Sequence, residues 1–237
     1  MKRYGFSVSA RRNRLPIRTP GKLYLALEFA AIFIVLPVLF WCQIIPPYNV
    51  IPVLVIVSLT CLLILLRSPG FDLRFLWNAR ALLPQLGRIA VLFLIAGLAM
   101  TTWFLLIDRE SFLLFPRTRP DLWMILMVLY PIFSAYPQEL IYRAFLFHRY
   151  ATFLRTETVR VWASAVTFGF VHILFRNLPA LLLSLAGGYI FALTYKRTKS
   201  VAASWFEHVL YGCLIFTVGM GKFFFHGTIR IASELVN

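Results

Sequence analysis

Long apolar runs separated by short, polar and mostly basic segments are the main pattern of this chain. A transmembrane helix needs about 20 consecutive, mainly apolar residues to cross the hydrocarbon core of a bilayer. Runs of this kind predict seven spans, at about 23–45, 48–66, 89–107, 121–148, 161–176, 178–195 and 200–220. The predicted fold class is therefore all-α: a polytopic membrane helix bundle of about seven transmembrane helices.

The composition supports a membrane protein and argues against a soluble domain. Of the 237 residues, 60% are hydrophobic and only 14% are charged, and the mean hydropathy is +0.79. A soluble domain of this size would leave much of that apolar surface in water, because only part of a small chain can be buried. The three cysteines lie in apolar runs, and an odd number of buried thiols does not form a disulfide framework.

A formal charge of +15 is typical of proteins that bind nucleic acid, but the distribution of the basic residues argues against such a partner. They cluster in short segments between the spans, and seventeen of the 24 Lys and Arg residues fall on one side of the predicted bundle. The cytoplasmic loops of membrane proteins carry such an excess. We therefore predict no nucleic-acid partner, a cytoplasmic N-terminus, and location in a bacterial cell membrane.

The spans divide the chain into three parts. Residues 1–20 are basic and are expected to be disordered in the cytoplasm, in contact with anionic lipid headgroups. Residues 21–220 form the bundle, whose first helix is too long for a cleaved signal peptide. Residues 221–237 form a short C-terminal segment. Residues 71–88 mix Phe, Leu and Trp with Arg, and this mixture predicts a helix lying in the membrane interface.

Ionisable side chains inside a membrane are costly, and for that reason they are candidates for function. Glu139, His172 and His208 lie in the fourth, fifth and seventh spans. Counted from the basic ends of these spans at 1.5 Å per residue, their depths are about 14, 18 and 14 Å. Three helices thus bring a carboxylate and two imidazoles to one level, and we expect the three to line one cavity that opens toward the cytoplasm.

Local spacing adds partners to these residues. Glu139 and Arg143 are four positions apart, so they share a helix face and are expected to pair. Phe168 stands four positions before His172, and its ring is expected to pack beside the imidazole. Glu207 precedes His208 and is either a structural partner or a member of the site. A stripe of small residues in the sixth span predicts close helix packing; it comprises Ala180, Ser184, Gly188 and Ala192.

A carboxylate and a histidine shielded from bulk water can deprotonate a water molecule. A second histidine can donate to the oxyanion that forms when water attacks a carbonyl group. The set therefore indicates peptide-bond hydrolysis. The H-E-x-x-H pattern of zinc peptidases is missing from the sequence, although two histidines and one glutamate are enough to hold zinc with one open position. A divalent metal such as zinc therefore remains a candidate cofactor.

At these residues the sequence resembles the CPBP family, which comprises the type II CAAX prenyl endopeptidases and bacteriocin-processing relatives. The family motif E-E-x-x-x-R corresponds to Gln138-Glu139-Leu-Ile-Tyr-Arg143, F-x-x-x-H to Phe168–His172, and H-x-x-x-N/D to His208–Gly212. The similarity covers roughly residues 120–215. It implies an intramembrane endopeptidase whose substrate is a membrane-associated protein or peptide, for example a prenylated one.

Two positions depart from the family pattern. The first glutamate of the family, which with the F-x-x-x-H histidine activates water, is Gln138 here, and an amide is not a base at neutral pH. The last motif's asparagine, understood to stabilise the oxyanion, is Gly212 here. Three interpretations stay open: an endopeptidase of reduced activity in which Glu139 or Glu207 replaces the base, a catalytically silent relative that binds a peptide or lipidated tail, and a small transporter or proton-relay protein.

Overall fold

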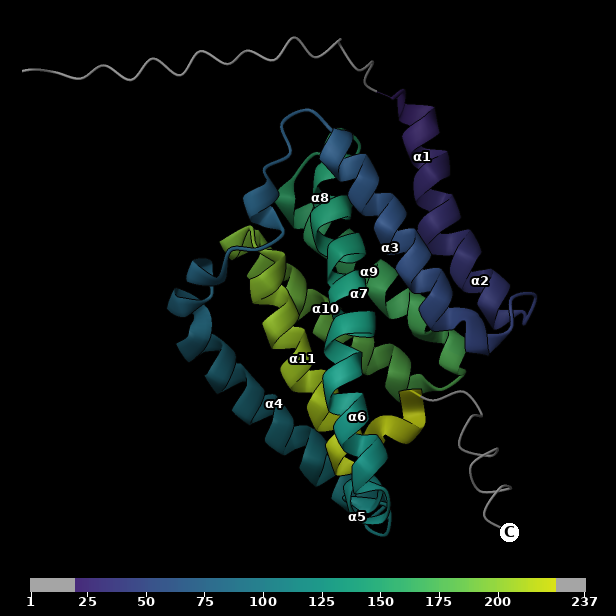
Figure 1. Cartoon of the computed structure of the whole chain (residues 1–237), viewed down its shortest axis with the longest axis vertical. Coiled ribbons are helices and arrows are strands. Elements are labelled where there is room, and N and C mark those ends of the chain that lie inside the picture. The colour runs from purple at the N-terminus through teal and green to yellow at the C-terminus, as the bar shows by residue number, and fades with distance from the viewer. Residues whose placement is uncertain (1–19, 225–237) are drawn as a thin grey trace, which may run out of the picture.

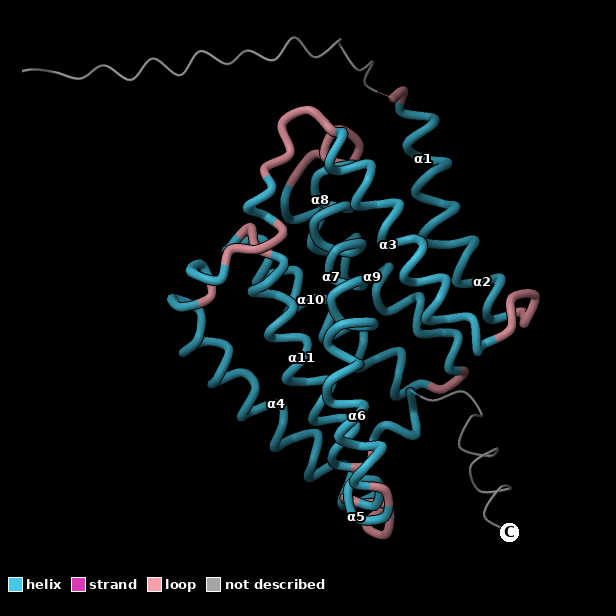
Figure 2. The backbone as a smooth tube through the Cα atoms, viewed as in Figure 1, coloured by secondary structure: helices cyan, strands magenta, loops and turns pink. Residues whose placement is uncertain are grey.

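Seven membrane-length helical spans run side by side in the computed structural model, which describes residues 20–224 (Figure 1). They are Lys22–Trp41, Pro47–Arg67, Ala79–Ile107, Pro120–Arg149, Glu157–Phe175, Leu178–Thr198 and Val201–Val218. All regular structure in this part of the chain is helical (Figure 2), so the predicted all-α membrane bundle is confirmed. The expectations for residues 1–19 and 225–237 lie outside the described residues.

Several spans are built from more than one helical segment. The first comprises α1 (Lys22–Ala30), the π-helical turn η1 (Ala31–Val35) and α2 (Leu36–Trp41), and the second comprises η2 (Pro47–Asn49) and α3 (Val50–Arg67). The third is mostly α4 (Leu86–Ile107), and the short α5 (Leu114–Thr118) follows it. The fourth contains α6 (Pro120–Tyr130), η6 (Pro131–Ala135), α7 (Tyr136–Glu139), η7 (Leu140–Phe145) and α8 (Leu146–Arg149). Two of its turns, η6 and η7, are π-helical, a form that is frequent at functional sites.

The last three spans begin at side-chain caps. They are α9 (Glu157–Val171) with η8 (His172–Phe175), α10 (Leu178–Thr198), and α11 (Val201–Val218), which is followed by η9 (Met220–Phe224). Each helix is preceded by a residue whose side-chain oxygen accepts a hydrogen bond from a backbone N–H of the first turn, namely Thr156, Asn177 and Ser200. Such caps satisfy donors that a helix start otherwise leaves unpaired.

The predicted interfacial helix over 71–88 is wrong as a single helix. This segment forms three short 3₁₀ turns, η3 (Leu73–Phe75), η4 (Ala79–Ala81) and η5 (Leu83–Gln85), before α4 begins. Pro84 has no backbone N–H and Asp72 caps the first turn by accepting from the Arg74 amide, so the local chemistry favours short turns. Leu73, Trp77 and Leu83 are nevertheless exposed, as expected of a segment at the membrane interface.

The small-residue stripe of α10 packs against α9, as predicted. Ala180, Ser184, Gly188 and Ala192 are all buried. A Cβ added at Gly188 would lie 3.0 Å from the Phe168 ring and 3.2 Å from the Cα of Ala165. The missing side chain thus lets α9 and its Phe168 approach α10 closely.

Replacing Gly188 with leucine is expected to destabilise the fold by about 1–3 kcal/mol, because the new side chain overpacks this contact and displaces Phe168. Thermal unfolding in detergent measures the effect. Gly87→Leu is the matched control, because Gly87 is exposed and a Cβ there meets nothing within 4 Å. Equal melting temperatures for the two variants would contradict the prediction.

Candidate functional site

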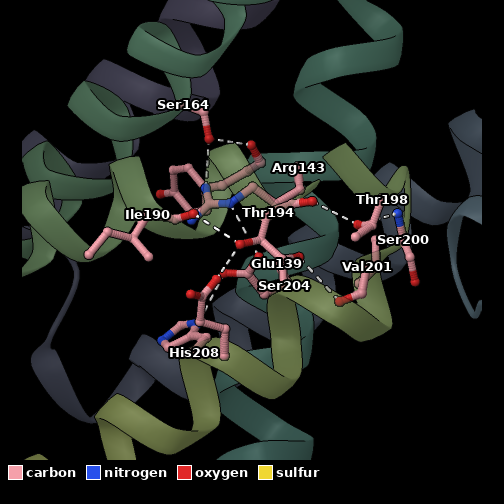
Figure 3. A network of polar contacts seen from close by, with 12 residues as sticks. Glu139, Arg143, Ser164, Ile190, Thr194, Thr198, Ser200, Val201, Ser204 and His208 are labelled. Carbon is pink, nitrogen blue, oxygen red and sulfur yellow. Dashed lines mark hydrogen bonds and ion pairs between the residues drawn. The ribbon is translucent and has the colours of Figure 1, made fainter. Parts of the chain in front are cut away.

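Glu139 ends α7, where the fourth span widens into the π-helical turn η7. Its side chain is 0% exposed, as is that of Arg143, and Glu139 Oε2 lies 3.2 Å from Arg143 Nε. The predicted pair is therefore present. The other carboxylate oxygen, Oε1, lies 3.0 Å from His208 Nδ1. Figure 3 shows Glu139 between Arg143 and His208.

Arg143 connects the fourth span to its neighbours. Its Nη1 donates a hydrogen bond to Ser164 Oγ on α9 at 2.6 Å, and Ser164 Oγ donates to the Tyr142 carbonyl at 2.7 Å. The guanidinium lies over the Phe168 ring, 5.0 Å from its centroid. Its Nε and Nη2 form no aligned hydrogen bond within residues 20–224, so the Glu139 contact is an ion pair without hydrogen-bond geometry. Burying a cation in this way is tolerable only beside a counter-charge.

His172 is the first residue of η8, directly after α9. Its Nδ1 lies 2.6 Å from the carbonyl oxygen of Phe168, so Nδ1 carries the proton and donates it. The second nitrogen of the neutral ring, Nε2, therefore has a free lone pair. The Phe168 ring packs 4.9 Å from the imidazole, centroid to centroid, as the spacing predicted.

His208 lies on α11, and both its Nδ1 and the face of its ring contact neighbouring side chains. Its Nδ1 faces Glu139, and its ring stacks on Phe191 at 4.7 Å with an interplanar angle of 17°. Phe168 contacts this imidazole as well, at 5.4 Å, so one phenyl ring packs against both histidines. The F-x-x-x-H phenylalanine thus spaces the two imidazoles.

Both histidines border a cavity of about 730 Å³. Its walls are mainly apolar side chains of all seven spans, and its polar border residues include Gln138, Tyr130, His172 and His208. Glu139 is not among the border residues, because it lies behind His208. The structure therefore brings the three predicted groups together, but only the two imidazoles reach the cavity.

The predicted opening of this cavity toward the basic loops is wrong. Its lining extends to Phe40, Val50 and Phe175, which lie at the opposite ends of their spans. The half nearer the basic loops is filled by buried aromatic side chains such as Phe145 and Tyr195. The position of a residue along its helix sets its depth in the membrane. The packing of the other side chains decides in which half of the bundle the cavity lies.

Gln138 borders the cavity, whereas its neighbour Glu139 does not. Successive residues of a helix diverge by about 100°, so only one of the two can face the same space. Gln138 Nε2 donates a hydrogen bond to Ser134 Oγ at 2.8 Å, which leaves its carbonyl oxygen as an acceptor toward the cavity. Gln138, which takes the place of the first glutamate of the family, therefore presents an amide to the cavity.

Glu207 lies in the part of the polar network of Figure 3 that includes Thr194. Its buried carboxylate is 3.3 Å from Arg88 Nη2 and accepts a hydrogen bond from Thr194, so it joins α11 to α4 and α10. It does not border the cavity. No three His, Cys, Asp or Glu side chains within residues 20–224 are grouped so that they could hold a metal ion.

Tyr130 is a cavity residue that the sequence did not single out. Its hydroxyl lies 2.1 Å from the position that a Cβ on Gly212 would occupy. One signal was available: Tyr130, Ser134 and Gln138 recur at four-residue spacing and so share one face of the fourth span. The significance of that face emerges only from the contact with α11.

The fold and this site define a polytopic helical membrane protein in which paired imidazoles border an apolar cavity. Residues 120–214 match the model of the family described as type II CAAX prenyl endopeptidase Rce1-like. All three motifs and the whole candidate site lie in this segment, so the resemblance to the CPBP family is confirmed there. Neither a curated protein nor a solved structure matches the chain.

Proposed function

We propose that this protein is an intramembrane endopeptidase that hydrolyses a peptide bond of a membrane-associated peptide carrying an apolar tail. One observation carries the proposal: two imidazoles, each held through Nδ1, border a single apolar cavity. Each ring thus keeps its Nε2 for chemistry. The match of residues 120–214 to an endopeptidase family supports the same reaction class.

His172 is the proposed general base. With Nδ1 donating to the Phe168 carbonyl, Nε2 can take a proton from a water that the carbonyl oxygen of Gln138 orients. The water oxygen bonds to the peptide carbonyl carbon, and the carbonyl electron pair moves to its oxygen. The oxyanion then re-forms the C=O bond as the C–N bond breaks, and the proton passes from His172 to the leaving nitrogen. The products are a carboxylic acid and an amine, and transfer of the acid proton to the amine leaves a carboxylate and an ammonium group.

His208 is the proposed electrophile. The Glu139 carboxylate accepts from Nδ1–H and so holds the ring, and in this scheme Nε2 carries a proton that it donates to the oxyanion. Glu139 does not border the cavity, so it is a positioning residue in this scheme. Arg143 in turn holds Glu139 and contacts the ring of Phe168.

The cavity indicates the class of substrate. Its volume lies in the range of about 300–1,000 Å³ that is typical of small-molecule sites. Its lining offers few polar partners beyond the groups assigned above, so an isoprenoid or similarly apolar chain on the peptide fits better than a charged one. Membrane lipids and a lipidated peptide are therefore the proposed partners.

Purified protein in liposomes is expected to release the C-terminal fragment of a membrane-tethered, prenylated reporter peptide, identified by mass spectrometry. The rate is expected to be unchanged by a chelator, because each step above uses only side chains and water. A folded protein that releases no fragment would favour the catalytically silent relative, an alternative that rests on the amide at position 138.

The distribution of basic residues supports a cytoplasmic N-terminus in a bacterial cell membrane, which places the loop after α2 outside. Cys42 is exposed, so the expectation that all three thiols are buried is wrong for this residue. In intact cells, a membrane-impermeant maleimide is expected to label Cys42 of the natural protein. The variant Arg155→Cys with Cys42→Ser should react only after permeabilisation, because Arg155 is exposed in the loop between α8 and α9. Labelling of position 155 from outside would reverse the orientation.

A further inference from the structure

The hydroxyl of Tyr130 occupies the space where the side chain of residue 212 would begin. A Cβ built on Gly212 would meet the Tyr130 hydroxyl oxygen at 2.1 Å and the ring atoms Cε1 and Cζ at 2.4 Å. These separations are far below van der Waals contact, so a side chain at position 212 would have to displace Tyr130 from its present place. Glycine at 212 is therefore what allows the hydroxyl of a residue on α6 to reach α11.

The surroundings hold Tyr130 in this place. Its ring packs edge-on against Phe216 at 5.3 Å and against the His208 imidazole at 6.0 Å. Both Tyr130 and Gly212 border the cavity. The Tyr130 hydroxyl forms no hydrogen bond with any described residue. A phenol that reaches an apolar cavity without a partner keeps its O–H for a ligand.

Position 212 is one helical turn after His208, so a donor there lies beside that imidazole. We propose that the Tyr130 hydroxyl is the second donor to the carbonyl oxygen of the substrate, acting with His208 from the position that Gly212 leaves empty. This inference rests on the proposed hydrolase function. The hydroxyl donates a hydrogen bond to the oxyanion throughout the reaction and transfers no proton. The apparent loss of a donor on α11 is thus offset by a donor from α6.

Tyr130→Phe keeps the ring and removes only the hydroxyl, so the fold should be retained. In the liposome assay we expect kcat to fall by about 10²–10³-fold with little change in KM, because the donor acts on charge that develops in the transition state. The matched control is Tyr189→Phe on α10, whose ring packs on Trp162 away from the cavity; its kcat should stay that of the natural protein.

A relocation experiment adds a test that a merely structural role would fail. Gly212→Asn alone should reduce activity and stability, because the new side chain collides with Tyr130. In a Tyr130→Ala background the same substitution should raise activity, because it provides a donor in the vacated space. Gly212→Asn is thus expected to lower activity in the natural protein and to raise it in the Tyr130→Ala variant. This opposite effect is expected only if the two positions share one function.

Binding of a peptide phosphonate, which presents a tetrahedral anionic oxygen, separates this inference from the hydrolase proposal. The natural protein should bind it more tightly than the matched amide, and Tyr130→Phe should lose that preference. If the natural protein shows the preference but never cleaves, the donor is supported and the hydrolase function fails. If Tyr130→Phe keeps both cleavage and the preference, or if the natural protein shows no preference, the role of Tyr130 is overturned.

Discussion

His172→Gln is expected to lower the rate of peptide cleavage by about 10²–10⁴-fold, the usual contribution of a general base. Its Nε2 is the proposed proton acceptor, and a glutamine amide in its place is not basic. KM should change little, because the imidazole forms only a small part of the cavity wall. The measurement is fragment release in the liposome assay, together with thermal unfolding as a control for folding.

The matched control is His148→Gln at the end of the fourth span. His148 is half-buried and its ring packs against Phe71 at 5.1 Å, but it does not border the cavity. This variant should cleave at the rate of the natural protein. Should His172→Gln cleave as fast as His148→Gln, the proposed base, and with it the hydrolytic scheme, is wrong.

Glu139→Gln is expected to affect both folding and catalysis. It leaves the fully buried Arg143 without its counter-charge, and breaking a buried pair in this way typically costs about 3–5 kcal/mol. It also removes the carboxylate that holds His208. We therefore expect a lower melting temperature and loss of cleavage in the same variant.

The double variant Glu139→Gln with Arg143→Met separates the two effects. Removing both charges should recover much of the stability, because no unpaired ion remains buried. Cleavage should remain lost, because His208 still lacks the carboxylate that accepts from its Nδ1–H and holds the ring. Recovery of cleavage along with stability would mean that Glu139 serves the fold alone.

Glu28→Gln provides the comparison for this pair. Glu28 bonds Arg149 at 2.8 Å and accepts from Tyr150, joining α1 to the end of the fourth span. Its carboxylate is 11% exposed and lies outside the cavity lining. Loss of this ion pair should therefore cost less stability than loss of the Glu139–Arg143 pair and should leave cleavage intact.

The two departures from the family pattern have different structural consequences. At position 138 the amide borders the cavity and can orient water, but it cannot accept a proton, which leaves His172 as the base. At position 212 glycine makes room for Tyr130. The lower activity expected from the sequence alone thus depends mainly on Gln138.

The sequence by itself determined the features that depend on local spacing. The seven spans follow from apolar runs of bilayer length. The pairing of Glu139 with Arg143 and the packing of Phe168 on His172 follow from four-residue spacing on one helix. The resemblance to the family was read from three motifs that are short and local, and they lie within the matched residues 120–214.

The tertiary structure alone decided which of these groups reach the cavity. A helix presents neighbouring residues about 100° apart, so Gln138 faces the cavity and Glu139 lies behind His208, and only the rotation of the fourth span against α11 sets that choice. The open half of the bundle depends on aromatic side chains from several spans. Tyr130 and Gly212 lie on different helices, and their contact depends on how α6 and α11 pack, which no local pattern in the sequence encodes.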